Sequence, residues 1–478
     1  MPIDTSKSMT QQMGGIQHIF MLGIGGSGMS GIAEVLAQLG YRVSGSDIED
    51  GSVVARLRKM GIEVHIGHDA QNIQGADVLV TSNAVPQSAP ELVAARAARL
   101  PIVPRAEMLA ELMRYRQGIA VAGTHGKTTT TSLLASVFGE AGEDPTFVIG
   151  GLLNNAGSNA RLGAGQYLIV EADESDASFL HLLPMVSVVT NVEADHMDHY
   201  AGDIAKYEQA FLDFLHNLPF YGLAILCLDD PGVQRLLPQI TRRVVTYGRH
   251  SEADYCVSSV AVTGLKTNFE LCRPQSRPSL TINLNMPGEH NALNAAAAAA
   301  VATELGLPDE AIEKGLSQFS GVGRRFSPVG EVAWRGGTAQ MIDDYGHHPS
   351  EVRATLNAAR AAFPNRRIVM VFQPHRFSRT RDFYEDFVAV LSNCDLLILL
   401  DVYAAGEDHI AGADTRSLAR SIRQRGVIDP IFAPDIKSVP AVLCDVLEQG
   451  DLLLTQGAGN IGQLARQVAE ADCLEVLL

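Results

Sequence analysis

Two glycine-rich segments stand where a buried strand is expected to run into a helix. The first is Gly23-Ile24-Gly25-Gly26-Ser27-Gly28, and Asp47 follows at the end of the next expected strand. Glycines let the backbone approach a diphosphate closely, and the free N–H groups and the dipole at a helix start favour its negative charge. The segment therefore predicts a nucleotide diphosphate site, for which a nicotinamide dinucleotide and a sugar nucleotide both remain open.

The second segment is Gly123-Thr124-His125-Gly126-Lys127-Thr128, again between an expected strand and an expected helix. Backbone amides in such a turn surround phosphate oxygens, Lys127 adds a positive charge near the outermost bridging oxygen, and the Thr128 hydroxyl can ligate magnesium. The strict eight-residue pattern has glycine where this chain has Val121, so the segment is a shortened variant. It predicts a loop that binds a nucleoside triphosphate.

Acidic side chains follow two further expected strands, in the segments 171–174 and 193–199. Because ligands sit at the carboxyl edge of a parallel α/β sheet, we expect these groups on the same edge as the second loop. Magnesium prefers oxygen ligands, so Glu171 and Thr128 form a sensible pair, whereas a histidine such as His196 is a less usual ligand. The alternative for these residues is a solvated acidic face and a hydrogen-bonded loop histidine.

Two loops near the C-terminal end, 343–349 and 372–380, are jointly rich in His, Asp and Arg. Arg376 and Arg379 can grip carboxylate or phosphate oxygens bidentately, which predicts an anionic substrate. For His375 and Asp343 an exposed polar loop is the better interpretation. The pattern Gly457 to Gly462 repeats the spacing of the first segment, and tight packing of a strand on a helix explains it without a further cofactor.

These segments require sheets to position them. Apolar runs alternate with helical stretches along the 478 residues, which predicts parallel sheets covered by helices. At ~150 residues for a typical domain, this length corresponds to about three domains. We expect an α/β protein with a Rossmann-like N-terminal domain over residues 1–116. A central P-loop ATPase-like domain with a mixed sheet follows over 117–323, and a Rossmann-like C-terminal domain over 324–478.

Composition excludes several classes of function. The 37 basic and 54 acidic residues give a formal charge of -17, which disfavours non-specific binding of nucleic acid. The six cysteines are scattered without a C-x-x-C pair, so neither a disulfide framework nor a zinc site is expected. The first 14 residues lack an apolar signal region, and no apolar run approaches the ~20 residues of a membrane span. We expect a cytoplasmic protein without membrane insertion, as a monomer or homodimer.

Taken together, the motifs resemble those of the Mur ligases of peptidoglycan synthesis over nearly the whole chain. They are Gly-Thr-His-Gly-Lys-Thr-Thr, Asn-Val-Glu-Ala-Asp-His-Met-Asp, Gly-Glu-His-Asn-Ala-Leu-Asn, Gly-Arg-Arg-Phe, Asp-Asp-Tyr-Gly-His-His-Pro and Gln-Pro-His-Arg-Phe-Ser-Arg-Thr. The resemblance implies a three-domain enzyme. Its first domain would hold a UDP-sugar, its second ATP with magnesium, and its third would help to admit an amino acid and close over the site.

The resemblance also assigns residues by position. Those implied for the UDP-sugar are Gly23, Gly25, Gly26, Ser27, Gly28, Asp47 and Ser82. Those implied for ATP are Gly123, Thr124, His125, Gly126, Lys127, Thr128, Thr129, His290, Asn291, Asn294 and Arg325. Those implied for magnesium are Thr128, Glu171 and His196. Tyr345, His347, Arg376 and Arg379 match the region for the carboxylate and the incoming amino acid, and the catalytic set would be Lys127, His347, Arg376 and Arg379.

Within the family, the resemblance is strongest to the activity that joins L-alanine to the lactyl carboxylate of UDP-N-acetylmuramate through an acyl phosphate. Ligases that act later in the pathway carry a modified lysine shortly after the Asp-His-Met-Asp segment, where this chain has only Lys206 nearby. The nearest alternative is a peptide-recycling ligase that adds a tripeptide to the same sugar nucleotide. From other classes, an NAD-dependent dehydrogenase or a non-catalytic ATP-driven switch would explain fewer of the motifs.

Overall fold

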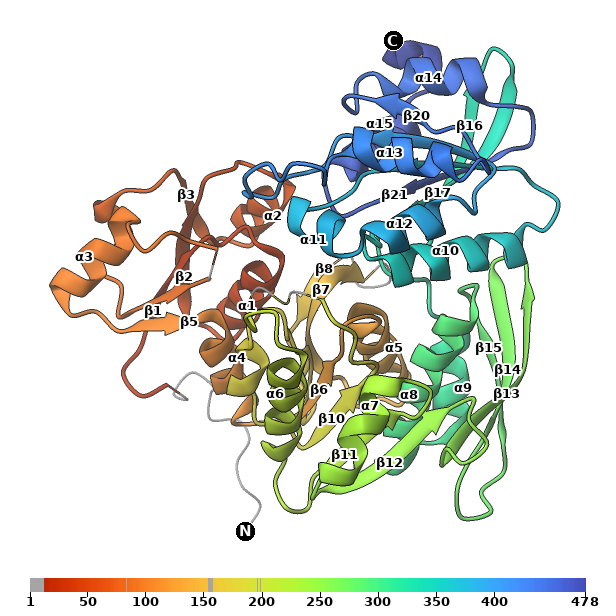
Figure 1. Ribbon diagram of the computed structural model, residues 1–478. Helices are drawn as coiled ribbons and strands as arrows, with labels where there is room; N and C mark the ends of the chain where they lie inside the picture. The colour runs from red at the N-terminus through yellow and green to blue at the C-terminus, as the bar shows by residue number, and fades with distance from the viewer. Residues whose placement is uncertain (1–12, 83, 154–157, 196, 198) are drawn as a thin grey trace. The chain divides into compact units, whose positions relative to one another are not determined.

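The computed structural model describes residues 13–82, 84–153, 158–195, 197 and 199–478 (Figure 1). By its internal contacts the chain divides into two compact units, and each is described by itself. Unit 1 comprises Met1–Cys256, Cys272–Pro278 and Asn294–Leu316. Unit 2 comprises Val257–Leu271, Ser279–Leu293 and Ser317–Leu478. The expected α/β architecture of three domains with parallel-dominated sheets is confirmed.

The N-terminal part of unit 1 is a five-stranded parallel sheet in the order β3-β2-β1-β4-β5. Its strands are β1 (His18–Leu22), β2 (Arg42–Asp47), β3 (Glu63–Ile66), β4 (Val78–Thr81) and β5 (Ile102–Pro104). Its helices are α1 (Ser27–Gln38), α2 (Ser52–Lys59), α3 (Pro90–Ala98) and α4 (Arg105–Met113), with a short 3-10 turn at Ala70–Ile73. The strand order reverses between β1 and β4, which is the kind of point where open α/β sheets bind ligands.

The central part of unit 1 continues with strands in the order β12-β11-β10-β6-β9-β7-β8. They are β6 (Gln117–Ala122), β7 (Thr146–Leu153), β8 (Ser158–Arg161), β9 (Tyr167–Glu171), β10 (Val186–Val189), β11 (Leu223–Cys227) and β12 (Arg243–Gly248). All neighbours are parallel except β7 and β8, so the expected mixed sheet is present. The main helices here are α5 (Lys127–Glu140), α6 (Ile204–His216), α7 (Pro231–Leu236) and α9 (Asp309–Ser317).

Helix α5 is held against α9 at very short range. Ser136 donates a hydrogen bond to the Gly315 carbonyl at 2.7 Å. A Cβ atom added to Gly315 would lie 2.6 Å from the Val137 Cα, closer than real Cβ atoms come to backbone. Only glycine therefore fits at this helix crossing, which fixes the C-terminal half of α5, the helix that follows the second glycine loop.

Unit 1 has one core cluster that joins its N-terminal and central parts. Buried side chains of α1, such as Ile32 and Leu36, belong to the same cluster as Val148 of β7 and Ala160 of β8. A Cβ atom at Gly31 would lie 3.1 Å from Val148 and 3.2 Å from Ala160. The helix that follows the first glycine loop thus packs directly on the outer strands of the central sheet, as the ribbon in Figure 1 also shows.

Unit 2 contains a six-stranded sheet in the order β16-β17-β21-β18-β19-β20, parallel except for the β16–β17 pair. Its strands are β16 (Ser327–Trp334), β17 (Gly337–Asp344), β18 (Ile368–Phe372), β19 (Leu396–Leu400), β20 (Ile431–Ala433) and β21 (Leu452–Gln456). Its helices are α10 (Pro349–Ala362), α11 (Phe377–Asp382), α12 (Tyr384–Leu391), α13 (Thr415–Gln424), α14 (Val439–Val446) and α15 (Ile461–Glu470).

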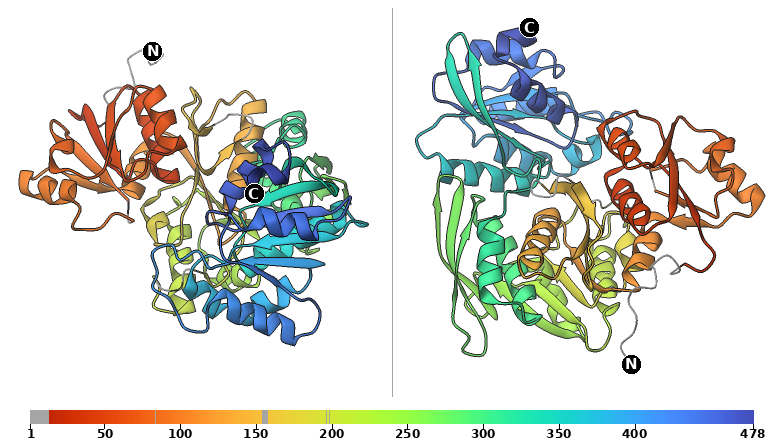
Figure 2. Two further views of the ribbon diagram at one scale, coloured as in Figure 1. Left: turned by 90° about the horizontal axis from the view of Figure 1, so that it is seen from above. Right: turned by 180° about the vertical axis from the view of Figure 1, so that it is seen from behind.

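Both faces of this sheet are covered (Figure 2). Alternate residues of β18 enter different core clusters: Met370 packs with α10, α12 and α13, whereas Val371 packs with α14 and α15. This explains why the strand reads as one continuous apolar run.

Two antiparallel strands, β14 (Lys266–Cys272) and β15 (Leu280–Leu284), precede α8 (Glu289–Glu304).

In the part of the chain that the structure describes, no helix combines the length and the apolar character that crossing a membrane requires.

Candidate active site

The first glycine loop lies between β1 and α1, as the sequence predicts. Gly23 and Ile24 donate their N–H groups to the Ser46 carbonyl at 2.9 and 3.1 Å. The Gly25 N–H donates to Asp47 Oδ2 at 2.7 Å, and a Cβ atom at Gly25 would lie 2.8 Å from the same oxygen. The structure thus brings Asp47 into contact with the loop, and only glycine leaves room for it.

Two further side chains border this loop. A Cβ atom at Gly23 would lie 3.5 Å from Ser82 Oγ, so Ser82 is placed beside the loop. A Cβ atom at Gly28 would lie 2.6 Å from Arg105 Nη1, and Arg105 Nη2 lies 3.2 Å from Asp173 Oδ2. Arg105, at the start of α4, was not predicted, because its place depends on the crossing of α4 and α1. Gly26 caps α1 without a side-chain bond, and the Ser27 side chain lies outside what the structure describes.

A buried carboxylate near the end of β2 was also missed. Glu91 is fully buried and its Oε1 accepts hydrogen bonds from Ser46 Oγ at 2.9 Å and from Asn72 Nδ2 at 3.0 Å. Burial raises the pKa of this carboxyl, but the bonds from Asn72, Ser46 and His68 outweigh burial and hold the pKa below its ordinary value. In the sequence, Glu91 directly follows Pro90 at the start of α3, which is typical of the first turn of an exposed helix. Its burial was therefore not predicted.

The second glycine loop connects β6 to α5. The His125 N–H donates to Asn191 Oδ1 at 2.8 Å, and Thr124 Oγ1 donates to the Glu193 carbonyl at 3.0 Å. A Cβ atom at Gly126, which has φ +84°, would lie 2.6 Å from Asn294 Oδ1. Thr129 follows in the buried first turn of α5. The structure therefore brings Asn294 against the loop, together with the predicted residues at positions 123–129.

Lys127 lies at the start of α5 and is largely buried. Its Nζ donates to the carbonyls of Gly123 at 2.6 Å and Thr124 at 3.1 Å, and it contacts both carboxylate oxygens of Glu174 at 2.9 and 2.8 Å. Burial lowers the pKa of the amine, but the carboxylates of Glu174, Glu171 and Asp173 outweigh it and raise the pKa above its ordinary value. Lys127 is therefore a fixed cation inside the loop.

Thr128 and Glu171 are adjacent, as the sequence predicts for a magnesium site. Thr128 Oγ1 lies 3.1 Å from each carboxylate oxygen of Glu171, and the Gly150 N–H donates to Glu171 Oε2 at 2.8 Å. A hydroxyl and a carboxylate are the hard oxygen ligands that magnesium prefers, so this donor set fits the ion. His196, the third predicted ligand, lies outside the described residues, and the full set of ligands stays a prediction.

The other residues predicted for ATP belong to unit 2. Burial and then the charge of Arg325 lower the pKa of His290 to about 4, so its ring is neutral at pH 7. Asn291 Nδ2 donates to the Pro287 carbonyl at 2.8 Å, which closes the turn before α8. The Arg325 guanidinium lies 5.2 Å from the centre of the Tyr345 ring and 3.5 Å from Glu351 Oε1.

The predicted amino-acid site forms one cluster after β17 and β18. The ring centres of Tyr345 and His347 are 5.5 Å apart, as are those of His347 and His375. Arg379 Nη1 donates to the His375 carbonyl at 3.2 Å, and Arg376, with φ +71°, directly precedes α11. The structure therefore brings Tyr345, His347, Arg376 and Arg379 to the same edge of the sheet.

Glu407 was not predicted, although it supports this cluster. Its carboxylate accepts from Ser378 N at 3.0 Å and from Ser378 Oγ at 2.6 Å, and it lies 3.8 Å from Arg376 Nη1. Burial raises the pKa of Glu407, but the Ser378 bonds and the Arg376 charge outweigh it and lower the pKa. It comes from a loop after β19 with no motif of its own, so the sequence carries no signal for it.

The expectation of an exposed polar loop was wrong for Asp343, whereas His375 does lie in a loop but is only partly exposed. Asp343, expected in an exposed loop, is buried at the end of β17, where it pairs with Arg324 at 2.8 Å and accepts from Thr455 Oγ1 at 2.7 Å. His375 is half-buried and stacks on Tyr403 at 5.5 Å between ring centres. Asp343 is buried because β21 lies beside β17, and His375 is partly covered because β19, which leads to Tyr403, lies beside β18. Local patterns encode neither neighbourhood.

The last glycine pattern packs tightly, as expected. A Cβ atom at Gly457 would lie 2.7 Å from the Gln373 carbonyl oxygen, and one at Gly462 would lie 2.6 Å from Arg324 Cζ. These contacts explain the glycines without a ligand.

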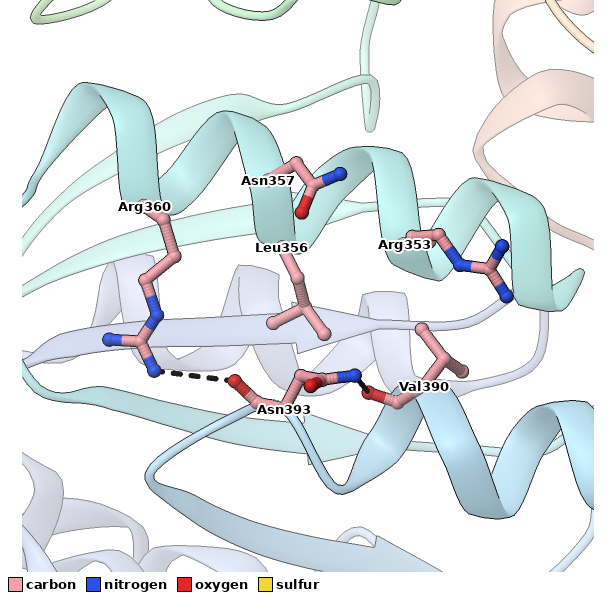
Figure 3. Close-up of a pocket in the computed structure, with 6 residues that line it drawn as sticks. All are labelled: Arg353, Leu356, Asn357, Arg360, Val390 and Asn393. Carbon is pink, nitrogen blue, oxygen red and sulfur yellow. Dashed lines mark hydrogen bonds between the residues drawn. The ribbon is translucent and has the colours of Figure 1, made fainter.

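A polar pocket of about 370 Å³ lies elsewhere in unit 2, between α10 and the end of α12 (Figure 3). It is lined by Arg353, Leu356, Asn357, Arg360, Val390 and Asn393. Arg360 pairs with Asp395 at 2.8 Å and donates to the Asn393 carbonyl at 3.3 Å. None of the residues predicted from the sequence lines this pocket.

Comparison with known proteins covers most of the chain. The model of the Mur ligase family, catalytic domain, matches residues 18–117, and that of the Mur ligase middle domain matches 121–302. The model of the Mur ligase, glutamate ligase domain matches residues 324–459.

Solved structures agree with these matches. The chain is similar to the UDP-N-acetylmuramate-alanine ligase of Thermotoga maritima, with 29% identity, a TM-score of 0.81, and coverage of 95% of this chain and 98% of that one. A UDP-N-acetylmuramate:L-alanyl-gamma-D-glutamyl-meso-diaminopimelate ligase from Neisseria meningitides is 28% identical over 65% of this chain and 100% of that one, with a TM-score of 0.59. A murein peptide ligase of Psychrobacter arcticus shares the fold, with 22% identity, a TM-score of 0.70, and coverage of 95% and 98%.

Three consecutive domain models thus match in order, and the likeness to the Thermotoga enzyme extends over almost the entire sequence. The chain belongs to the Mur ligase family.

Proposed function

We propose that this Mur ligase joins L-alanine to the lactyl carboxylate of UDP-N-acetylmuramate, with ATP as the source of energy. Membership of the family makes the chain an ATP-dependent ligase of peptidoglycan precursor synthesis. The observation that carries the proposal is the buried Lys127 ammonium at the start of α5, next to the Thr128–Glu171 pair. A cation and hard oxygen ligands at a helix N-terminus form the arrangement that phosphoryl transfer from ATP requires.

The reaction needs an activation step, because a carboxylate resists attack by an amine. In the proposed reaction a lactyl carboxylate oxygen attacks the γ-phosphorus of ATP, the bond to the β,γ-bridging oxygen breaks, and an acyl phosphate and ADP form. The amine of alanine then attacks the acyl carbon and phosphate leaves. Lys127 would stabilise the charge that builds up on the transferred phosphoryl group.

Thr128 and Glu171 would hold magnesium beside that phosphate. When bound there, the ion would supply positive charge that offsets the repulsion between the carboxylate and the phosphate. Asn294 and the amides of residues 123–128 would position the nucleotide, and His290 and Asn291 would lie near its adenosine.

The cluster in unit 2 would receive the carboxylate and the amino acid. Arg376 and Arg379 are suited to bidentate contact with a carboxylate. His347 would orient or deprotonate the ammonium of alanine. In unit 1, the amides of residues 23–28 would bind the diphosphate of UDP, with Asp47 and Ser82 beside it.

The likeness to the Thermotoga alanine ligase favours alanine as the amino acid, since that structure has the higher TM-score over the full chain, 0.81 against 0.70 for the Psychrobacter murein peptide ligase. The second candidate is ligation of a preformed tripeptide, which the 28% identity to the Neisseria ligase supports. A dehydrogenase would leave Lys127 and the Thr128–Glu171 pair without a use.

Phosphate release from ATP tests the proposal. With UDP-N-acetylmuramate and magnesium present, we expect release to require L-alanine and to be far slower with L-alanyl-γ-D-glutamyl-diaminopimelate. Faster release with the tripeptide would assign the recycling reaction instead. Release that ignores UDP-N-acetylmuramate altogether would contradict both assignments.

A further inference from the structure

Glu174 is the principal counter-ion of Lys127, yet no step of the proposed reaction uses it. It follows β9 by three residues and is 1% exposed. Its two carboxylate oxygens lie 2.9 and 2.8 Å from Lys127 Nζ. The other hydrogen bonds of the ammonium go to loop carbonyls, so Glu174 is the acidic group in direct contact with the cation.

The surroundings of Glu174 keep it in this place. Tyr200 Oη donates to the Glu174 backbone carbonyl at 2.5 Å, and the Tyr200 ring packs edge-on against Tyr207 at 4.9 Å between centres. Tyr207 Oη is in turn 3.1 Å from Thr124 Oγ1 of the glycine loop. The backbone of Glu174 is therefore connected, through Tyr200 and Tyr207, to the same loop whose lysine its carboxylate contacts.

Hydrogen bonds compensate only in part for the burial of the Glu174 carboxylate. Glu174 Oε2 is buried and accepts no hydrogen bond of good geometry, although it faces the ammonium. Burial and the charge of neighbouring Asp173 outweigh the effect of Lys127 and raise the pKa of Glu174 to about 7. A buried carboxylate with one cation as its main support becomes costly as soon as that cation turns to another anion.

We propose that Glu174 occupies, in the nucleotide-free protein, the place on Lys127 that a phosphate of ATP takes, so that it lowers the affinity for ATP by competing for the lysine. This inference rests on the proposed function of the loop. Glu174 is thus a positioning residue that acts through Lys127. It holds the lysine charged and oriented until the nucleotide arrives, and it gives up the lysine when the phosphate binds.

The direction of the effect follows from charge. ATP binding to the wild-type protein must break a buried ion pair and leave a carboxylate beside a phosphate. Glutamine at position 174 has nearly the same shape without the negative charge, so neither cost arises. The same change leaves Lys127 without its counter-ion in the free protein, which further favours the nucleotide-bound state.

The test is calorimetric titration of the full-length protein with ATP in magnesium buffer, without sugar nucleotide or alanine. We expect Glu174→Gln to bind ATP about tenfold more tightly than wild type. AMP, which lacks the outer phosphates, should bind equally to both. The shorter acid in Glu174→Asp retains the charge at a greater distance from Nζ and should give an intermediate affinity.

Glu140→Gln is the matched control. Glu140 lies at the far end of α5 from Lys127 and pairs with Lys314, so this change also removes a carboxylate charge that is paired with a lysine, but away from the loop, and it should leave ATP affinity unchanged. The free Glu174→Gln protein should also unfold at a lower temperature than wild type but gain more from ATP. A purely structural role would lower the unfolding temperature without tightening ATP binding, and that result would overturn the inference.

Lys127→Ala separates this inference from the proposed function. If Lys127→Ala loses ATP affinity while Glu174→Gln binds ATP no more tightly than wild type, only the competition is wrong. If Lys127→Ala binds ATP normally, the loop does not bind the phosphates and both statements fail. Should Glu174→Gln not fold, the ATP affinity of Glu174→Asp decides, and a value equal to or weaker than wild type contradicts the competition.

Discussion

The two glycine loops of unit 1 both meet a carboxylate, but at different groups. In the first loop Asp47 accepts a backbone N–H, that of Gly25, at 2.7 Å. In the second loop Glu174 contacts a side-chain cation, Lys127, at 2.8 Å. Backbone amides cannot leave their place, whereas a lysine side chain can turn from one anion to another. The first loop is therefore suited to binding one ligand throughout the reaction. The second loop is suited to binding a phosphate group that is transferred during the reaction.

The largest expected effect concerns the lysine, which has no equivalent in the first loop. Lys127→Ala should reduce ADP formation by about a thousandfold, or about 4 kcal/mol of transition-state stabilisation. Binding of UDP-N-acetylmuramate should remain close to that of wild type, since its proposed site is the first loop. Steady-state rates and equilibrium binding measured on one preparation check both statements, and normal turnover would refute the assignment of the phosphate loop.

The next effect concerns the oxygen ligands at the second loop, which are Thr128 directly after the loop and Glu171 at the end of the neighbouring strand β9. Glu171→Gln keeps the shape of the side chain but removes the charge that a magnesium ion would contact. We expect the rate to fall by about a hundredfold and the magnesium concentration for half-maximal rate to rise. A magnesium titration of both proteins is the measurement, and an unchanged magnesium dependence would remove Glu171 from the metal site.

A smaller effect is expected at the first loop. The added methyl in Gly25→Ala would lie 2.8 Å from Asp47 Oδ2, so the carboxylate must move away from the loop. The KM for UDP-N-acetylmuramate should rise about tenfold while the KM for ATP stays constant. Gly51→Ala is the control, because a Cβ atom there meets nothing within 4 Å. Equal changes in both KM values would show that the two loops are not separate sites.

The smallest effect sharpens the contrast between the carboxylates. Glu91, in the N-terminal part, has a folded pKa below its ordinary value of 4.5, so it stabilises the fold above that pH and ceases to do so as the pH falls through the folded pKa. Glu91→Gln should therefore cost about 1 kcal/mol at pH 7. That difference should shrink in acid. Urea unfolding of both proteins at pH 7 and pH 4 measures this difference in the free energy of unfolding. A difference that increases in acid would contradict the lowered pKa of Glu91.

The elements of the fold could be predicted where the local pattern is strong. The alanine-rich stretch from Asn291 to Leu305 predicts a helix and corresponds to α8 at Glu289–Glu304. The apolar run from Ile119 to Ala122 predicts a strand and is part of β6 at Gln117–Ala122. The run from Arg367 to Phe372 predicts a strand, which is β18 at Ile368–Phe372, buried throughout as in a covered parallel sheet. The residues that predict each of these elements lie within a few positions of one another in the sequence.

The supporting charges of the site could not be predicted in the same way. Arg105 and Glu407 reach their partners over 68 and 29 residues of sequence, respectively, through crossings that no local pattern records. Glu174 stood within a recognised acidic segment, but its pairing with Lys127 depends on β9 lying next to β6. The expectation for Asp343 was wrong for the same reason, since its burial depends on β21 lying beside β17. Motifs locate the groups that meet the ligand, whereas the fold decides which groups hold them.

The contact between Ser136, Val137 and Gly315 limits how the enzyme can respond to a nucleotide. Because its C-terminal half packs tightly on α9, helix α5 cannot slide along its axis, so adjustment is left to the lysine side chain and the turn before it. A single methyl group introduced at Gly315 would displace helix α5 and thereby misplace the phosphate loop at its N-terminal end. Screens for inactive variants should therefore recover Gly315, a residue that touches no substrate.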